Sequence, residues 1–185
     1  ITCVGNGNWG ESSTQTVHAY DVLLYKGVMM IHDKRRVAFV EERLVEAESI
    51  LCIYARSEHL NETGGTYGMA VNDADGLLYA TRIDIFNLAD LREGKELKRV
   101  RNFVYKNKPY ALDFYQGRLF VSSNGTEKFC EVDPATGEII KDYTVIGDIT
   151  LQAPEKFCIR RNTLFITDRK KNNACVYAIP MSELK

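Results

Sequence analysis

Three segments of this chain have nearly the same sequence, and each forms an apolar stretch that precedes a polar turn. They are GLLYAT, GRLFVS and NTLFIT, and their leading leucines are Leu78, Leu119 and Leu164. Leu78 and Leu119 are 41 residues apart, and Leu119 and Leu164 are 45 residues apart. A repeat of roughly 40 to 50 residues that holds several short strands is typical of β-propeller blades.

The unit around Leu119 displays the expected strands of one blade. Four apolar or alternating stretches follow one another between turn sequences, at residues 110–114, 119–122, 128–132 and 139–143. The turn at 133–137 reads Asp-Pro-Ala-Thr-Gly, in which Pro fixes φ and Gly allows positive φ. Four short antiparallel strands in succession form one blade of a propeller.

We therefore predict an all-β fold, a small or partial β-propeller of about four four-stranded antiparallel blades in a single domain over residues 1–185. The expected repeat units cover roughly residues 17–60, 64–104, 108–146 and 153–185. The last unit lacks an outer strand. Residues 1–16 form a lead-in, and the strand at 1–4 is a candidate to close the last blade. A closed ring of four blades and an arc of a larger ring both fit this pattern.

The first unit is the most divergent, and residues 37–54 fit two interpretations. Apolar side chains recur there at helical spacing among glutamates, which predicts a short helix near residues 40–50. Residues 37–40 and 50–54 would also serve as strands. The repeat context favours the strands.

Charge and cysteine usage exclude several classes of function. The formal net charge is −1, so bulk charge attracts neither nucleic acid nor an anionic membrane. No apolar stretch approaches the roughly 20 residues that span a bilayer, and we expect no membrane insertion. The five cysteines form no CxxC pair and lack zinc spacing. We expect no metal and no cofactor.

Two features favour an extracellular origin. Asn61 and Asn124 each begin an N-x-[ST] sequon and are candidate N-glycosylation sites. The chain begins with Ile1 rather than Met, from which we expect a processed or trimmed form or a part of something longer. An extracellular glycan-binding propeller is therefore one alternative, while the compartment itself stays open.

Residues 110–145 resemble the repeats of the YVTN, NHL and quinoprotein-like propellers. The likeness lies in the segment Gly117–Ser122 and in Val132–Glu138, whose D-P-x-T-G turn closes the third strand. This resemblance implies the propeller architecture and leaves the activity open, because propellers host many unrelated functions.

Two enzymatic branches of that class can be compared with the chain. Residues 67–76 are similar to the strand-opening motif of gluconolactonase-like propellers, in which an Asp or Asn reaches a central metal. The matching positions here are Tyr67, Tyr110 and Glu155, and one carboxylate makes a poor divalent-cation site.

The second branch is the glutamine cyclotransferase-like propellers, whose repeats have similar G-x-L-Y-V-S and D-P-x-T-G segments. That resemblance implies acids near the axis, for which Glu155 and Asp168 are the candidates, with Asn124 as a polar clamp. The competing structural interpretation is that Asp168 begins a turn and that Asn124-Gly125 is a hairpin signal.

We expect a non-enzymatic propeller scaffold that binds another protein or belongs to a larger assembly. The absence of a nucleophile motif, the near-neutral charge and the ten tyrosines support this expectation. The alternative is a propeller enzyme or small-ligand binder that acts at the rim near Tyr67, Tyr110, Asn124, Glu155 and Asp168. We expect a protein partner or an oligomer, with a small molecule as the alternative ligand.

Overall fold

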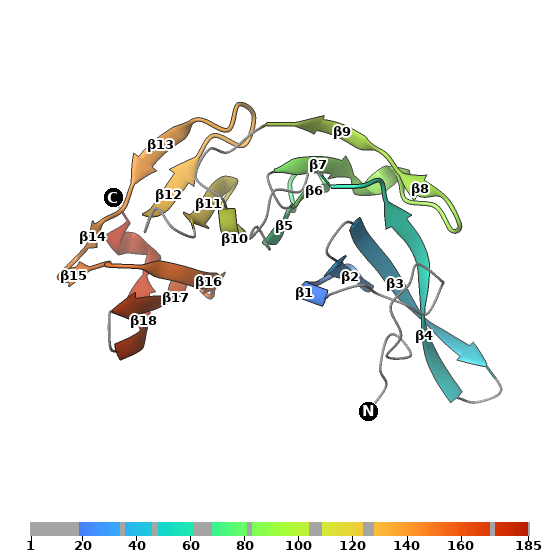
Figure 1. The fold of residues 1–185 in the computed structure, drawn as a ribbon, viewed down its shortest axis with the longest axis horizontal. Coiled ribbons are helices and arrows are strands. Elements are labelled where there is room, and N and C mark those ends of the chain that lie inside the picture. Colours follow the sequence, from blue (N-terminus) through green and yellow to red (C-terminus); the bar gives the residue numbers. More distant parts are fainter. Residues whose placement is uncertain are drawn as a thin grey trace.

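The chain folds into antiparallel β-sheets that are arranged as the four blades of a β-propeller, as a computed structural model shows (Figure 1). The structure describes residues 19–33, 36–45, 48–60, 68–80, 83–103, 109–123, 128–170 and 173–184, with the main chain alone at 41–45 and 48–54. The blades, numbered 1 to 4 in chain order, follow an arc whose concave side is lined by the first strand of each blade. The predicted propeller is confirmed.

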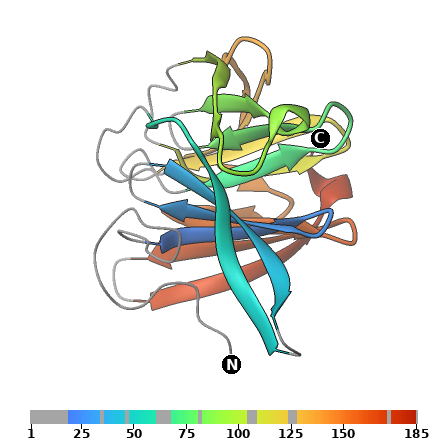
Figure 2. The same ribbon diagram turned by 90° about the vertical axis from the view of Figure 1, so that its right-hand side faces the viewer.

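Blade 1 contains the four strands β1 (Ala19–Tyr25), β2 (Val28–Asp33), β3 (Arg36–Val45) and β4 (Glu48–Ser57). A fifth strand, β8 (Glu96–Leu97), pairs with β4 in parallel. The long β3–β4 hairpin lies in front of the other blades in Figure 2.

The strand interpretation of residues 37–54 is confirmed and the helical alternative near residues 40–50 is wrong, because the described residues 40–45 and 48–50 belong to β3 and β4. The two strands pair from Ala38 opposite Arg56 to Val45 opposite Glu48. This ladder satisfies the main-chain N–H and C=O groups of both segments. It also sends Phe39 into the core shared with blade 2, whereas Val40 faces the other side of the sheet.

Blades 2 and 3 each have four strands. Blade 2 contains β5 (Met69–Asn72), β6 (Leu77–Ala80), β7 (Asp84–Asn87) and β9 (Arg99–Asn102), with the short 3-10 turn η1 (Leu88–Asp90) after β7. Blade 3 contains β10 (Pro109–Tyr115), β11 (Arg118–Ser123), β12 (Lys128–Val132) and β13 (Ile139–Asp142).

Blade 4 has three strands within the described part of the chain. They are β16 (Pro154–Arg160), β17 (Thr163–Lys170) and β18 (Asn173–Pro180), followed by the 3-10 turn η2 (Met181–Glu183). A small hairpin of β14 (Val145–Ile146) and β15 (Ile149–Thr150) leads into it. The strand expected at residues 1–4 lies outside the described residues.

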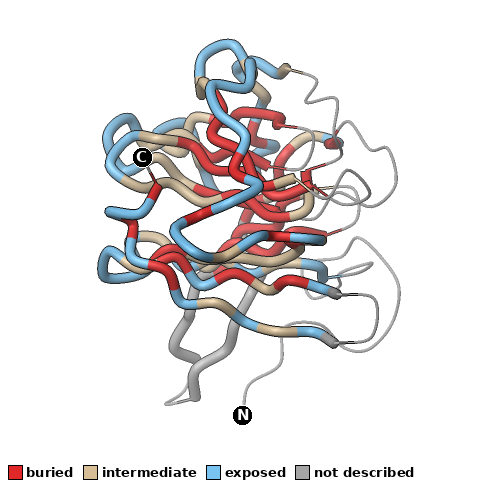
Figure 3. Tube along the Cα trace, turned by 90° about the vertical axis from the view of Figure 1, so that its left-hand side faces the viewer, coloured by how far each residue is buried: buried red, intermediate tan, exposed pale blue. Residues whose placement is uncertain are grey.

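Adjacent blades share separate apolar cores, and strand alternation builds them. Successive residues of a strand point to opposite faces, so Leu78 joins the core between blades 1 and 2 while Tyr79 joins the core between blades 2 and 3. In the next repeat, Leu119 faces blade 2 and Phe120 faces blade 4. In blades 2 and 3, the repeated leucine-aromatic pair therefore packs against both neighbouring blades. Figure 3 shows the resulting alternation of buried and exposed residues along the strands.

Candidate functional site

The first hairpin of each blade brings the four inner strands into one common register. The pairs that close these hairpins are Tyr25–Val28, Asn72–Leu77, Tyr115–Arg118 and Arg160–Thr163. The residue five positions before each closing residue is Tyr20, Tyr67, Tyr110 or Glu155. Tyr67, Tyr110 and Glu155 are thus repeat equivalents, and Tyr20 belongs to the same set. Tyr67 itself lies outside the described residues.

Three of these four inner strands are irregular at this level. The pairing register shifts between Ala19 and Asp21 in β1, between Pro109 and Ala111 in β10, and between Pro154 and Phe157 in β16. A β-bulge bends its strand and changes the direction of a side chain, and bulges occur often beside functional sites. At this end of the inner strands, the side chains therefore do not follow the regular alternation between the two faces of the sheet.

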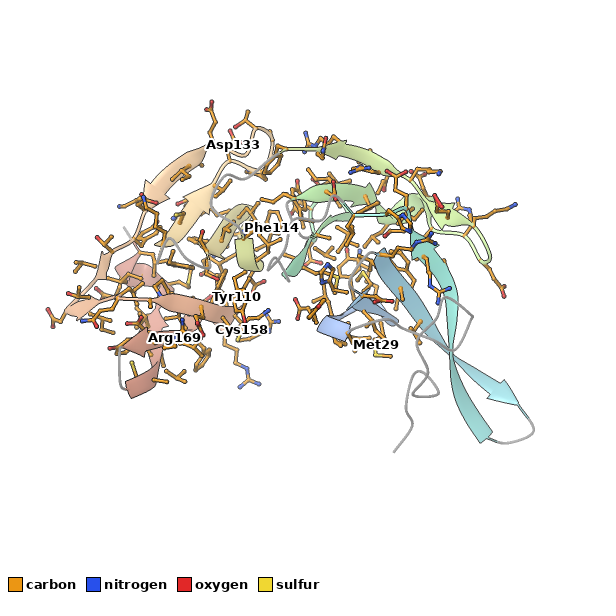
Figure 4. The ribbon with its side chains drawn as sticks, viewed as in Figure 1. Met29, Tyr110, Phe114, Asp133, Cys158 and Arg169 are labelled. Carbon is orange, nitrogen blue, oxygen red and sulfur yellow. The ribbon has the colours of Figure 1, made fainter. Side chains whose placement is uncertain are left out.

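Lys156 contacts Tyr110 across the boundary between blades 3 and 4. Its Nζ lies 3.2 Å from the main-chain oxygen of Tyr110 and 4.9 Å from the centre of the Tyr110 ring. Burial lowers the pKa of the Lys156 amine, and the negative charge of Asp21 opposes that shift. Figure 4 places Tyr110 beside the inner strand that bears Cys158.

Asp21 holds the corresponding place in blade 1. Its carboxylate accepts hydrogen bonds from the main-chain N–H of Met69 in blade 2 at 3.1 Å and of Val22 at 3.0 Å. Burial raises the pKa of Asp21, and the charge of Lys156 is the largest effect that opposes it. Asp21 and Lys156 occupy equivalent positions in blades 1 and 4 and carry opposite charges.

His32 in β2 is a buried imidazole whose pKa responds to the charge of Lys156. Burial and the positive charge of Lys156 lower its pKa to about 4, although Asp33 acts in the opposite direction. Its ring centre lies 6.1 Å from that of Tyr20. His32 is therefore uncharged at neutral pH. We call Asp21, His32, Tyr110 and Lys156 the inner cluster. They come from blades 1, 3 and 4, and Lys156 contacts Tyr110 and acts on Asp21 and His32 through its charge.

The acidic candidates Glu155 and Asp168 have separate partners. Glu155 pairs with Arg169 at 3.3 Å between Oε1 and Nε, and its main-chain oxygen accepts a hydrogen bond from the Ser122 hydroxyl. The carboxylate of Asp168 is buried and accepts hydrogen bonds from the main-chain N–H groups of Gln152 and Ala153 at 3.1 and 2.5 Å. Asp168 thus stabilises the loop that leads into blade 4. Asn61 and Asn124 lie outside the described residues.

The described residues include no group of three or more His, Cys, Asp or Glu side chains that could hold a metal ion. Within the same ranges, no helix has the length and apolar character that crossing a bilayer requires.

The terminal blades 1 and 4 each have an apolar sheet face whose equivalent in blades 2 and 3 is buried. Tyr79, Phe120 and Phe165 are repeat equivalents, and Tyr79 and Phe120 pack in the cores that their blades share with the following blade. Phe120 is fully buried, whereas Phe165 is 40% exposed. Val176 on the neighbouring strand β18 is 67% exposed and lies on the same face, because Thr167 pairs with Val176 and Phe165 with Ala178.

Blade 1 also has exposed apolar residues, on the sheet face that in blades 2 and 3 contacts the preceding blade. Val22 of β1 is 57% exposed, whereas its equivalents Met69 and Leu112 are buried against the preceding blade. Met29 packs with Ile31, Ala38 and Val40 in a small cluster that is separate from the three cores between blades. We call the exposed parts of these surfaces the blade 1 open face, formed by Val22, Leu24 and Met29, and the blade 4 open face, formed by Cys158, Phe165, Val176 and Ala178. Ile31, on the same side of blade 1 as Val22, is itself buried. Figure 4 labels Met29 and Cys158 on the two faces.

Comparison with known proteins places the chain among propellers without assigning it to a family. No protein-family model matches the chain, and no curated protein matches it. Among solved structures, it is similar to Kuenenia stuttgartiensis hydrazine synthase, with 12% identity, a TM-score of 0.62 and coverage of 96% of this chain and 50% of the other. The Neurospora crassa Pan2 WD40 domain gives 12% identity and a TM-score of 0.55, with 86% and 46% coverage.

Myxococcus xanthus glutaminyl cyclase is similar at 14% identity with a TM-score of 0.52, over 90% of this chain and 68% of the other. Identities this low establish the fold alone. The chain spans about half the length of the hydrazine synthase and Pan2 structures that it matches.

Proposed function

We propose that this chain is a non-catalytic propeller scaffold that assembles through its two open faces, and that the partner is a second copy of the chain. The carrying observation is the contrast between Phe120 and Phe165, which hold the same repeat position. Phe120 is covered by the next blade, while Phe165 ends the arc and is 40% exposed. A partner that supplies a propeller blade would bury Phe165 as blade 4 buries Phe120.

The two open faces are suited to each other. Each is an apolar sheet surface, and each occupies the side on which the interior blades contact a neighbour. Covering apolar surface stabilises an interface by about 25 cal/mol for each Å² removed from water. The blade 4 open face of one copy would meet the blade 1 open face of the next, in a head-to-tail contact that two copies can close into a ring.

The lengths of the similar structures support this arrangement. The chain covers about half of the hydrazine synthase and Pan2 chains that it matches, so two copies would together approach the length of those chains. Arg160 and Arg169 flank the blade 4 open face and would form the polar rim that such interfaces have around an apolar centre.

The test is the mass in solution, measured by light scattering coupled to size exclusion. We expect the wild type to have twice the 21.0 kDa mass of one chain. Phe165→Asp on blade 4 and Val22→Asp on blade 1 should each give the single-chain mass. The matched control Ile140→Asp changes an exposed apolar residue on the outer strand β13 and should leave the dimer intact.

A mixture of the two variants makes the test specific for a head-to-tail contact. Each homodimer would have a charged residue in both interfaces. A heterodimer of Phe165→Asp and Val22→Asp would keep one interface that joins two unaltered faces. We therefore expect equimolar mixing to restore dimers. A wild type that stays at 21.0 kDa at all concentrations, or variants that dimerise as the wild type does, would refute the proposal.

A further inference from the structure

A cavity of about 630 Å³ opens at the turn end of the inner strands, and all four blades contribute to its wall. Blade 1 provides Leu23 to Tyr25, blade 2 provides Ala70 to Ala74, blade 3 provides Asp113, Phe114, Gln116 and Gly117, and blade 4 provides Arg160. This volume is within the range of small-molecule sites, which run from about 300 to 1,000 Å³. None of Tyr110, Glu155 and Asp168 lines it.

Two of the charged side chains in the cavity wall, Asp113 and Arg160, are paired with each other. Asp113 accepts hydrogen bonds from Arg160 Nη1 at 3.2 Å and from the main-chain N–H groups of Ile159 and Phe114 at 2.7 and 2.9 Å. Asp73 interacts electrostatically with Lys26 at the adjoining turn. The Asp113–Arg160 pair cancels within the wall, and the exposed Asp73 adds a further carboxylate, so the wall has no excess of positive charge that would attract an anionic ligand.

The remaining side chains combine hydrogen-bonding groups with aromatic surface. The guanidinium of Arg160 is 63% exposed, which leaves N–H donors accessible beside the Gln116 amide and the Asp73 carboxylate. Tyr25 and Phe114 supply aromatic rings to the same wall. Paired donors and acceptors match neighbouring hydroxyl groups of a sugar, and an aromatic ring packs against the apolar C–H face of a pyranose.

We infer that this cavity, which we call the turn-end cavity, binds a neutral saccharide. The cavity wall shares Leu24 with the blade 1 open face and Arg160 with the rim of the blade 4 open face. The two proposals are tested by different measurements, so a protein that stays monomeric and binds the glycosides would refute the dimer and leave this inference standing. Arg160 would donate to one hydroxyl and Asp73 would accept from another, while an aromatic side chain of the wall, Tyr25 or Phe114, would contact the sugar ring.

The probes are the methyl glycosides of glucose, galactose, mannose and N-acetylglucosamine, followed by saturation-transfer difference NMR. We expect magnetisation transfer from the protein to the ring protons of at least one glycoside at millimolar concentration. Arg160→Ala removes the exposed donors, and Ala74→Trp fills the cavity from an exposed turn position. Each should raise the dissociation constant about 10-fold or more, since hydrogen bonds to charged groups contribute about 1.5–3 kcal/mol.

The matched control is Arg169→Ala, which removes an exposed arginine of blade 4 that does not line the turn-end cavity. Its affinity should equal that of the wild type, and circular dichroism checks that all variants remain folded. The inference is overturned if none of the glycosides receives magnetisation, or if Arg160→Ala and Ala74→Trp both bind as the wild type does. Binding of glucuronate without binding of methyl glucoside would also overturn it, because the ligand would then be recognised by charge.

Discussion

The carboxylate of Asp113 in blade 3 accepts a hydrogen bond from the main-chain N–H of Ile159 in blade 4, at 2.7 Å between Oδ2 and N. Asp21 makes the same kind of bond from blade 1 to Met69 of blade 2, although the two aspartates do not hold equivalent repeat positions. Neighbouring inner strands belong to different sheets and share no β-ladder. These side chains therefore provide direct polar links between blades close to the concave side of the arc.

The first prediction concerns the pH dependence that Asp113 imposes. Burial raises the pKa of this carboxyl above its ordinary value of 3.8, so folding favours the protonated form. The stability from this group is fully present below the unfolded pKa and is lost as pH rises through the folded pKa. Asp113→Asn keeps an oxygen acceptor for Ile159 and should reduce this loss.

Urea unfolding at a series of pH values from 3 to 7 measures the effect. Asp113→Asn should be as stable as the wild type or more stable at pH 7. Asp113→Ala should be less stable by about 1–3 kcal/mol, because it leaves the N–H of Ile159 without its acceptor. The prediction fails if the two variants lose the same amount of stability at pH 7.

The second prediction concerns His32, whose effect on the pH dependence of stability is opposite in sign to that of Asp113. Its pKa falls from 6.5 to about 4 in the folded protein, so between these values the unfolded chain binds a proton that the folded chain does not. Stability should therefore decrease by roughly 3 kcal/mol as pH falls from 6.5 to 4. Thermal unfolding of His32→Gln should show a smaller decrease over this interval. An unchanged slope would contradict the assignment.

The third prediction compares two aromatic residues at one repeat position. Phe120→Ala should lower the free energy of unfolding by about 3–5 kcal/mol, because it opens a cavity between blades 3 and 4. Phe165→Ala should cost about 1 kcal/mol or less in the single chain, where this residue is 40% exposed. Denaturant titration at a concentration that keeps the protein monomeric gives both values, and equal losses would refute the difference in burial.

The fourth prediction tests the close approach of two inner strands. A Cβ atom on Gly68 would lie 2.8 Å from Cα of Ala111 and 2.8 Å from N of Leu112. These are main-chain atoms, so blades 2 and 3 would have to move apart. Gly68→Ala should lower stability by about 1–3 kcal/mol, as measured by calorimetry. A variant that melts at the wild-type temperature would contradict the prediction, because blades 2 and 3 would then accept the added Cβ without loss of stability.

The fifth prediction separates Asp168 from Glu155. Asp168→Ala would leave the main-chain N–H groups of Gln152 and Ala153 without their acceptor in a buried site, at a cost of about 1–3 kcal/mol for each. Glu155→Gln removes an exposed ion pair with Arg169 and should change stability by about 1 kcal/mol or less. Equal melting temperatures for the two variants would contradict this division of roles.

The repeated leucine-aromatic pair was sufficient to predict the propeller, because a period near 40 to 50 residues and strand alternation are both properties of the local sequence. The secondary structure of the divergent first unit was harder to predict. Its spacing of apolar residues fits a helix, and the choice of strands depends on the ladder between β3 and β4 and on the cores to either side. Long-range pairing of this kind overrides local propensity.

The repeat positions of Tyr110 and Glu155 were predictable from the sequence, and the contacts that these residues make were not. Counting along the repeats correctly equates Tyr110 with Glu155, yet it passes over Lys156, the next residue along. The signal that could have found it is the opposite charge of Asp21 and Lys156 at one repeat position. Burial and the contact with Tyr110 come from the arc and the bulge in β16, neither of which local sequence specifies.

The parallel pairing of β8 with β4 also determines when blade 1 can be completed during synthesis. The first blade receives its outer strand from Glu96–Leu97, after β5, β6 and β7 have been made. On a ribosome, where the N-terminal end emerges first, the edge of β4 stays open until three strands of the second blade are available. A fragment cut between blades 1 and 2 would retain that open edge, which is a site for aggregation. The smallest piece that contains the whole first blade must therefore extend at least to Leu97.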